Sequence, residues 1–377
     1  MKVSVLQENL ARGLNIVSRA VSPRSTLPVL ANVLVATDEG RLRLSATNLE
    51  LGITCWIGAK IEEEGSTTVP ARTFTDLVST LPNELVEMSL NVRTQTLNVR
   101  CGPSNTDIKG IDSQEFPPLP VADLANGIEF NVADLKDMIQ QVVFAASNDD
   151  ARPILTGVLI SVQGNKITLE AADGFRLSVR KADLSTAVAK PIKSVIPARA
   201  LGELARIASD GDQLVTMVIP SGRGQVIFHM RDVELVSQLI EGSYPDLEQV
   251  IPRSTQTTTI LSTAAFLKAC KQAEIFAREG SHIARIQITP GSGLQPGQVE
   301  ISGQSEETGQ NLTVVDATIE GPGILIAFNV RFLREVLDVI NTPNVALETT
   351  VDTSPGVFRP VGEDSFLHVI MPMHLGN

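Results

Sequence analysis

Apolar residues recur along this chain with a spacing typical of helices that cover a sheet. In three places they stand at i, i+4, i+7 and i+11, which puts them on one face of a helix. The three sets are Leu10, Leu14, Val17 and Val21; Leu135, Ile139, Val142 and Ala146; and Phe266, Cys270, Ala273 and Ala277. Because the spacing is the same each time, it predicts three copies of one amphipathic helix.

A second apolar stripe follows each of these helices further along the chain. The stripes are Phe74, Leu77, Val78 and Leu81; Leu201, Leu204, Ala205 and Ala208; and Leu333, Val336, Leu337 and Ile340. Each is preceded by a similar tetrapeptide, which is VPAR at residues 69–72, IPAR at 196–199 and FNVR at 328–331. Repetition at a domain-sized period predicts three tandem copies of one folding unit.

Runs typical of strands follow the first helix of each copy, at residues 33–35, 158–160 and 285–287. Each copy therefore looks like a doubled β-α-β-β-β unit. A helix with one apolar stripe has to cover the apolar face of a sheet. We therefore expect an α+β fold in which the two helices of each domain pack on antiparallel sheets.

The pattern restarts after two proline-stiffened connectors, at residues 116–120 and 250–254. Phe116-Pro117 in the first connector has a counterpart at Tyr244-Pro245, so both connectors occupy the same place in their repeats. We predict three domains, spanning residues 1–125, 126–253 and 254–377.

The net charge of −12 argues at first against a nucleic-acid partner, because phosphate binding depends on clustered Lys and Arg. The six predicted helical segments, however, carry +3, so the rest of the chain carries −15. One interpretation is a weakly basic helical layer that faces a polyanion, and the other is ordinary solvated helix surface. Arg72, Arg199 and Arg331 recur at helix starts, where the helix dipole disfavours a cation, and this favours an external partner.

Catalytic, cofactor-binding and metal-binding residues are not predicted anywhere in the sequence. Cys55, Cys101 and Cys270 are odd in number and widely spaced, which indicates neither a disulfide framework nor a metal site and favours a reducing cytoplasm. The four histidines lack metal-ligand spacing, and the adjacent pairs at 149–150 and 306–307 are typical of solvated turns. The glycine-rich residues 221–224 predict a hairpin turn rather than a phosphate loop. No apolar run is long enough to span a membrane, and we expect the protein to be neither exported nor membrane-bound.

Six short segments, distributed over the whole chain, carry a family resemblance. They are MKV at residues 1–3, TLPVL at 26–30, VPAR at 69–72, DGFRL at 173–177, YPD at 244–246 and VIMPM at 369–373. In this order they resemble the beta subunit family of bacterial DNA polymerase III, the sliding clamps. The ending and the DGxRL segment are the most specific of the six.

The resemblance implies the DNA clamp fold and a homodimeric ring of six similar domains, with helices lining a hole that duplex DNA threads without sequence preference. It implies a non-catalytic processivity factor without a cofactor, located in the cytoplasm. Its partners would be the replicative DNA polymerase catalytic subunit, the clamp loader and other proteins with a clamp-binding motif. The alternative is a repeat-built peptide-binding adaptor that does not encircle DNA.

The resemblance also implies functional positions, which we transfer residue by residue. The partner-peptide pocket maps to Leu155, Ala172, Asp173, Gly174, Phe175, Arg176, Leu177, Pro245, Gln249, Val250, Val369, Met371, Pro372, Met373, His374 and Leu375. The DNA-facing positions map to Arg24, Arg72, Arg152 and Arg199, and the dimer interface maps to Ile108, Ile275 and Phe276. Methionine and leucine make an adaptable apolar surface that suits several related peptides.

Four pocket positions depart from the family pattern. Ala172 and Phe175 stand where relatives often carry Thr and His, and Gln249 and His374 stand where Arg is common. Fewer polar contacts to a bound peptide are therefore expected.

Overall fold

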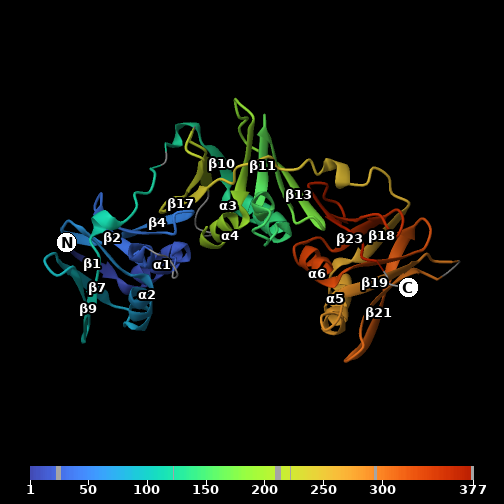
Figure 1. Cartoon of the computed structure of the whole chain (residues 1–377), viewed down its shortest axis with the longest axis horizontal. Helices are drawn as coiled ribbons and strands as arrows, with labels where there is room; N and C mark the ends of the chain where they lie inside the picture. Colours follow the sequence, from blue (N-terminus) through green and yellow to red (C-terminus); the bar gives the residue numbers. More distant parts are fainter. Residues whose placement is uncertain (23–26, 122, 209–213, 221, 293–294, 375–377) are drawn as a thin grey trace. The chain divides into compact units, whose positions relative to one another are not determined.

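The predicted apolar stripes form helices in the computed structural model, which describes residues 1–22, 27–121, 123–208, 214–220, 222–292 and 295–374. The α-helices within these ranges are α1 (Gln7–Val17), α2 (Ala71–Thr80), α3 (Val132–Val142), α4 (Ala198–Ile207), α5 (Thr263–Ala277) and α6 (Val330–Asp338) (Figure 1). Several begin with a side-chain cap from the last residue of the preceding strand. Asn329, for example, accepts a hydrogen bond from the backbone N–H of Arg331 at 3.0 Å.

Most stripe residues are buried, as predicted, but every α-helix named above except α5 ends before the last residue of its stripe. α1 buries Leu10, Leu14 and Val17, whereas Val21 lies beyond the short 3₁₀ turn η1 (Ser18–Ala20) and is only half-buried. Ala146 likewise follows the turn η5 (Val143–Ala145). The other 3₁₀ turns are η2 (Pro28–Ala31), η3 (Ser113–Glu115), η4 (Leu124–Asn126), η6 (Pro153–Thr156) and η7 (Glu248–Val250).

The chain divides into two compact units, and the division falls inside the central domain rather than between predicted domains. The first unit comprises Met1–Asp134 and Glu203–Leu239, and the second comprises Leu135–Gly202 and Ile240–Asn377. Each domain junction predicted from the connectors therefore lies within one unit.

The first unit contains a five-stranded and an eight-stranded antiparallel sheet among the described residues. The five strands, in spatial order, are β5 (Lys60–Glu63), β1 (Lys2–Leu6), β7 (Leu85–Asn91), β8 (Thr96–Cys101) and β9 (Ser104–Lys109). The eight are β10 (Ile128–Asn131), β15 (Leu214–Val218), β16 (Gln225–His229), β17 (Val233–Gln238), β4 (Leu51–Gly58), β3 (Arg41–Thr47), β2 (Asn32–Asp38) and β6 (Ser66–Pro70). Helix α1 lies close to this second sheet at Gly13, where a Cβ atom would stand 2.8 Å from Leu44 Cδ1.

The second unit contains one twelve-stranded antiparallel sheet within the part of the chain that the structure describes. Its spatial order is β14 (Ile192–Pro197), β11 (Gly157–Gln163), β12 (Lys166–Ala172), β13 (Arg176–Asp183), β25 (Phe366–Ile370), β24 (Gly356–Pro360), β23 (Asn344–Thr349), β18 (Thr257–Ser262), β21 (Gly309–Glu320), β20 (Gly297–Ser305), β19 (Ile283–Thr289) and β22 (Ile324–Asn329). Its largest core cluster joins α5, α6 and the last strands, with Phe266, Phe328 and Phe358 fully buried.

Each domain junction is made by a sheet that runs from one domain into the next. At the first junction, β17 of the central domain pairs with β4, and at the second, β25 of the C-terminal domain pairs with β13. In both cases the last strand of a domain adds to the third strand after the first helix of the preceding domain. The junctions are thus two copies of one arrangement.

Candidate functional site

The predicted peptide-pocket residues come from four segments of the second unit. They are the turn η6, the turn between β12 and β13 with its flanking strand residues, the second connector extended back to residue 244, and β25 with the residues that follow it. Leu375 lies outside the described residues. The structure therefore describes predicted pocket residues that are up to 219 positions apart in the sequence, from Leu155 to His374.

Two buried apolar clusters form the floor of this region. One contains Ala172, Leu177, Val179, Val357 and Val369, and the other contains Leu155, Leu159, Val195 and Tyr244. Leu247 of the connector packs against both clusters and so joins them. Val250 and Met371 remain 38% and 37% exposed, which leaves apolar surface available to a partner.

Leu247, Tyr244 and Val179 belong to this floor but were not among the predicted pocket residues. The sequence contained one usable signal for Leu247. The segments FPPL at 116–119 and YPDL at 244–247 align in the repeat, so Leu247 is equivalent to Leu119.

The loop between β12 and β13 is shaped by its aspartate and its glycine. Asp173 Oδ1 accepts hydrogen bonds from the backbone N–H groups of Phe175 at 2.8 Å and Arg176 at 3.1 Å. Gly174 has a φ of +96°, a left-handed conformation that glycine adopts without strain. The Phe175 side chain is consequently 62% exposed at the tip of the turn.

Arg176 supports this turn from inside the protein instead of presenting its guanidinium to a partner. The side chain is buried, and Nε donates to Asp173 Oδ2 at 3.0 Å. Nη1 donates to Glu335 of α6, and Nη2 donates to the carbonyl oxygen of Phe144. The guanidinium also lies 4.2 Å from the ring centre of Phe332. Arg176 therefore ties the pocket turn to the helix layer of the C-terminal domain.

Two titratable groups near Arg176 have shifted pKa values. Burial alone would raise the pKa of Glu335, but hydrogen bonds from Arg331 and Arg176 and their positive charges hold it below its usual value. His368 is fully buried, and its Nδ1 lies 2.6 Å from Ser178 Oγ. Burial, with the charge of Arg176, lowers the pKa of His368 well below 6.5, so the imidazole stays neutral in the folded protein at neutral pH.

The C-terminal segment is held in place by its backbone. The N–H of Met371 donates to the carbonyl oxygen of Phe175 at 2.8 Å, and that of Met373 donates to Ala327 at 2.8 Å. Gln249 and His374 stand at the two pocket positions where relatives commonly have arginine. Gln249 Nε2 donates to Asp246 Oδ2 at 3.2 Å, and His374 is exposed. The tail is thus an ordered edge of the pocket up to residue 374.

The predicted DNA-facing arginines differ in their surroundings. Arg72 is 95% exposed and only 3.8 Å from Asp76, whereas Arg199 is exposed and forms no ion pair with a described residue. Arg152 lies beside the pocket turn, where its Nη2 donates to the carbonyl oxygen of Asp173 at 3.3 Å. Arg24 lies outside the described residues.

Ion pairs within the helices neutralise much of their predicted positive charge. Arg331 pairs with Glu335 at 2.8 Å, and Arg334 pairs with Glu274 at 2.8 Å. Arg72 and Arg331 each pair with an acidic residue four positions later, Asp76 at 3.8 Å and Glu335 at 2.8 Å, so two of the three recurring arginines have a partner within their helix. Glu203, four positions after Arg199, pairs instead with Arg19 at 3.0 Å and Arg206 at 2.7 Å. Over the described residues, Arg12, Arg199 and Lys268 remain exposed without an ion pair, so the helical layer retains a small positive surface.

At both junctions the last strand of one domain pairs with the third strand after the first helix of another. Among the described strands, one last strand and one third strand lack such a pairing over part or all of their length. β9 is the last strand of the N-terminal domain, as β17 and β25 are of theirs, and among the described strands it pairs only with β8. β21 is the third strand after α5, and β18 covers only its residues 317–320. The open part, residues 309–316, carries Leu312 at 60% and Val314 at 47% exposure.

The predicted interface residues are located near these two edges. Ile108 lies on β9 with its side chain buried in its own domain, so it contributes backbone more than side-chain surface. Ile275 is exposed on α5, and Phe276 beside it is half-buried near Gly309, at the start of β21.

Among the described residues, no three His, Cys, Asp or Glu side chains gather in a way that could hold a metal ion. All three cysteines are free and buried, and burial raises the pKa of Cys55 to about 11. Over the same residues, no helix is both long and apolar enough to cross a membrane.

Comparison with known proteins covers the chain from end to end. Family models of the DNA polymerase III beta subunit match residues 1–120 (N-terminal domain), 129–246 (central domain) and 248–374 (C-terminal domain). The beta sliding clamp of Synechococcus elongatus is 33% identical over 379 residues and that of Staphylococcus aureus 32% over 382, with at least 99% of both chains covered.

Solved structures agree with the family models. The sliding clamp of Bacillus subtilis superposes with a TM-score of 0.93 at 29% identity, and that of Pseudomonas aeruginosa bound to griselimycin with 0.91 at 27%, each over the full length of both chains. With three consecutive domain matches and the same fold throughout, this chain belongs to the DNA polymerase III beta subunit family, the bacterial sliding clamps.

Proposed function

We propose that two copies of this chain close into a ring around duplex DNA and act as the non-catalytic processivity clamp of the replicative DNA polymerase. The open edges of β9 and β21 carry this proposal. A last strand joins a third strand at both junctions inside the chain, so β9 of one copy can join residues 309–316 of β21 in the other. Two such contacts close a two-fold dimer, and they satisfy both open edges.

The three domains of this ring would span residues 1–125, 126–253 and 254–377. The family models support this division because their matched ranges end inside the two connectors or next to them. The ring would then contain six domains related by one repeated strand pairing.

DNA contact would be loose and independent of sequence. Arg72 and Arg199, together with Arg12 and Lys268, offer exposed cations to phosphates, while the net charge of −12 opposes tight binding elsewhere. A ring that encloses DNA needs few attractive contacts, because its attachment is topological. Weak contacts also permit sliding.

The pocket in the second unit would receive short apolar motifs of partner proteins. We infer that these partners are the polymerase catalytic subunit, the clamp loader and other replication and repair proteins. The apolar floor joined by Leu247, the exposed Val250 and Met371, and the exposed Phe175 supply the surface. The site of action would be the cytoplasm.

The decisive experiment measures retention of the purified protein, once loaded, on nicked circular duplex and on the same duplex after linearisation. Retention on the circle with loss after linearisation supports the ring. Equal release from both at moderate salt would contradict it. Light scattering gives a second measurement, because a peptide-binding adaptor that never encircles DNA can remain a single chain whereas the ring needs two copies.

A matched control separates closure from folding. Replacing Leu312 and Val314 with Lys puts like charges on the open part of β21 without touching the core. We expect a folded monomer that is not retained on the circle. The double substitution of exposed Leu49 and Leu214 with Lys, both at the eight-stranded sheet of the first unit, should leave the dimer intact.

A further inference from the structure

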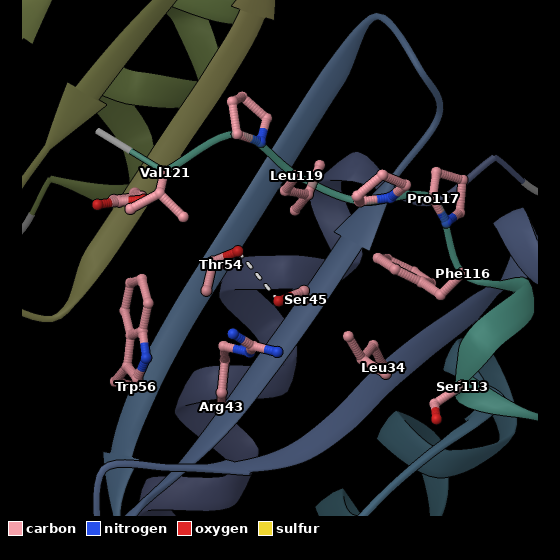
Figure 2. Close-up of a pocket in the computed structure, with 13 residues that line it drawn as sticks. Leu34, Arg43, Ser45, Thr54, Trp56, Ser113, Phe116, Pro117, Leu119 and Val121 are labelled. Carbon is pink, nitrogen blue, oxygen red and sulfur yellow. Dashed lines mark hydrogen bonds between the residues drawn. The ribbon is translucent and has the colours of Figure 1, made fainter. Parts of the chain in front are cut away.

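A second pocket lies at the first junction, where the connector 116–121 passes over the β2–β3–β4–β17 face (Figure 2). Its volume is about 300 Å³. Arg43 and Ser45 on β3, Thr54 and Trp56 on β4, and Glu234 on β17 lie on its floor. None of these residues belongs to the predicted peptide pocket.

This pocket occupies the same place in the repeat as the peptide pocket. At the first junction, Leu34, Ser45, Thr54 and Glu234 stand side by side across four strands. At the second junction, the equivalent row is Leu159, Glu170, Val179 and Leu367. The next backbone contact also repeats, since Trp56 N–H donates to Asp232 and Lys181 N–H donates to Ser365.

The connectors repeat as well. Val29, Leu30 and Phe116 form a buried cluster with Leu34 and Leu119 packed on it, as Leu155, Leu159 and Tyr244 do with Leu247. Leu119 stands so close to the strand that a Cβ on Gly52 would lie 2.6 Å from its Cδ2. The first junction therefore has the frame of a peptide site with different chemistry on its floor.

The floor is polar at two positions where the second junction is apolar, and the second junction has Glu170 where the first has Ser45. Thr54 and Glu234 replace Val179 and Leu367, and Ser45 Oγ and Thr54 Oγ1 form a buried pair at 3.0 Å. An apolar motif suited to the second pocket would cover the Glu234 carboxylate here, where Leu367 stands at the second junction. The first pocket is thus built for a ligand that supplies polar groups of its own.

The hydrogen bonding of Arg43 indicates which chemical group a ligand of this pocket should carry. Its Nε is buried without a hydrogen-bond partner among the described residues, and its Nη1 reaches Asp38 only at 3.4 Å. Figure 2 shows the guanidinium between Trp56 and the Ser45–Thr54 pair. The side chain as a whole is 37% exposed, and its Nη2 donates to no described residue, so Nη2 is the donor that an acceptor on a ligand can reach.

Glu234 on β17 supplies a hydrogen-bond acceptor on the same floor, two strands away from Arg43 on β3. Its Oε1 is engaged by His229 Nδ1 at 2.9 Å, which leaves Oε2 for another donor. A peptide group offers one acceptor and one donor without charge, and so matches Arg43 and Glu234 together. A free carboxylate would meet Glu234, and an ammonium group would meet Arg43.

We propose that the first-junction pocket binds a short, uncharged, extended peptide segment of a partner protein, with an apolar side chain held between Trp56 and the connector prolines. The ligand carbonyl accepts from Arg43, and its N–H donates to Glu234. The analogy rests on the proposed function, since that function makes the second-junction pocket a peptide site. The partly exposed Arg43 guanidinium, whose Nη2 has no partner among the described residues, supports the site independently.

The test uses Trp56, which is the only tryptophan in the chain. Full-length protein labelled with 5-fluorotryptophan gives one fluorine NMR signal from this pocket. The probes are acetylated and amidated Gly-Xaa-Gly peptides, with Leu, Ile, Met, Phe, Tyr or Pro as Xaa. We expect a saturable shift with at least one of them, and about tenfold weaker binding in Arg43→Met. Arg231→Met, at an exposed position of the same unit, should bind like the unaltered protein.

Three results would overturn the proposal. They are the absence of a saturable shift with all six probes at their solubility limit, a shift only with the unblocked peptides or inorganic phosphate, and unchanged affinity in folded Arg43→Met. A parallel arm uses protein lacking residues 371–377, which should lose clamp-motif binding and keep the Trp56 response. Loss of both responses would place the probe in the second pocket and also reject the proposal. Failure of the ring experiment would leave the Trp56 measurement unaffected.

Discussion

The two domain junctions share one pattern of strand pairing and differ in the side chains that the paired strands carry. At the first, the strand row under the connector carries Ser45, Thr54 and Glu234, and at the second it carries Glu170, Val179 and Leu367. Strand pairing through backbone groups tolerates either set, because side chains on one face do not enter the ladder. The repeat thus conserves geometry while each junction is free to acquire its own ligand chemistry.

A second difference lies beneath the floor. Arg176 at the second junction corresponds to Leu51 at the first, and only Arg176 links its strand to a helix through ion pairs. The second junction therefore has a buried charged support that the first lacks.

Arg176→Leu, which installs the first-junction residue at the second, should give the largest effect. It leaves Asp173 and Glu335 without their buried partner, so we expect a loss of about 3–5 kcal/mol in the free energy of unfolding. Denaturant unfolding measures it. Adding Glu335→Leu should recover part of the loss, and an undiminished loss in the double variant would show that the ion pair is not the cause.

Deletion of residues 371–377 removes the C-terminal segment that borders the predicted peptide pocket at the second junction and has no counterpart at the first. We expect at least about a hundredfold loss of clamp-motif peptide affinity, because Met371 and Met373 anchor this edge through Phe175 and Ala327. Fluorescence anisotropy with a labelled peptide measures the affinity. Dimer mass by light scattering should not change, and unchanged peptide affinity would refute the pocket assignment.

Acidification should weaken the second junction through His368. Its folded-state pKa is well below 6.5, so the unfolded chain takes up a proton that the folded protein excludes, and stability falls as the pH drops below 6.5. At pH 5.5 the loss should be about 1.4 kcal/mol from this group. Unfolding curves of the unaltered protein and of His368→Phe, compared at pH 7.5 and 5.5, isolate the contribution. An equal pH dependence in both would contradict it.

Gly52→Ala should produce the smallest change, confined to the first junction. The added Cβ would stand 2.6 Å from Leu119 Cδ2, the end of a side chain, and at ordinary contact distance from Thr47 Oγ1. A small shift of Leu119 relieves the clash, so we expect a cost of about 1 kcal/mol or less. The Trp56 fluorine signal should shift while clamp-motif binding stays the same. A loss of clamp-motif binding would mean that the two junctions are not independent.

Local patterns predicted the elements of this fold well. The stripes at 10, 14 and 17 and at 266, 270, 273 and 277 are buried on helices, because a helical period is set by neighbouring residues. Val21 was misplaced because a 3₁₀ turn ends the helix first.

The peptide pocket was assigned through the resemblance and stays a prediction. The structure adds Leu247 to the apolar contacts around its residues and directs Arg176 inward toward Glu335. The inward direction of Arg176 has no signature in spacing, because its partner Glu335 is 159 residues away, whereas Leu247 could have been found from the alignment of the two connectors.

The sequence by itself determined that one α+β unit occurs three times, that its helices bury one face, and where proline stiffens the chain between units. Tertiary structure alone decided that last strands join third strands at each junction, and that β9 and part of β21 stay open. It also decided that Thr54 and Glu234 lie under one connector where Val179 and Leu367 lie under the other. The physical reason is that periodicity is a property of adjacent residues, whereas strand partners and pocket walls are chosen by long-range packing, which a local pattern does not encode.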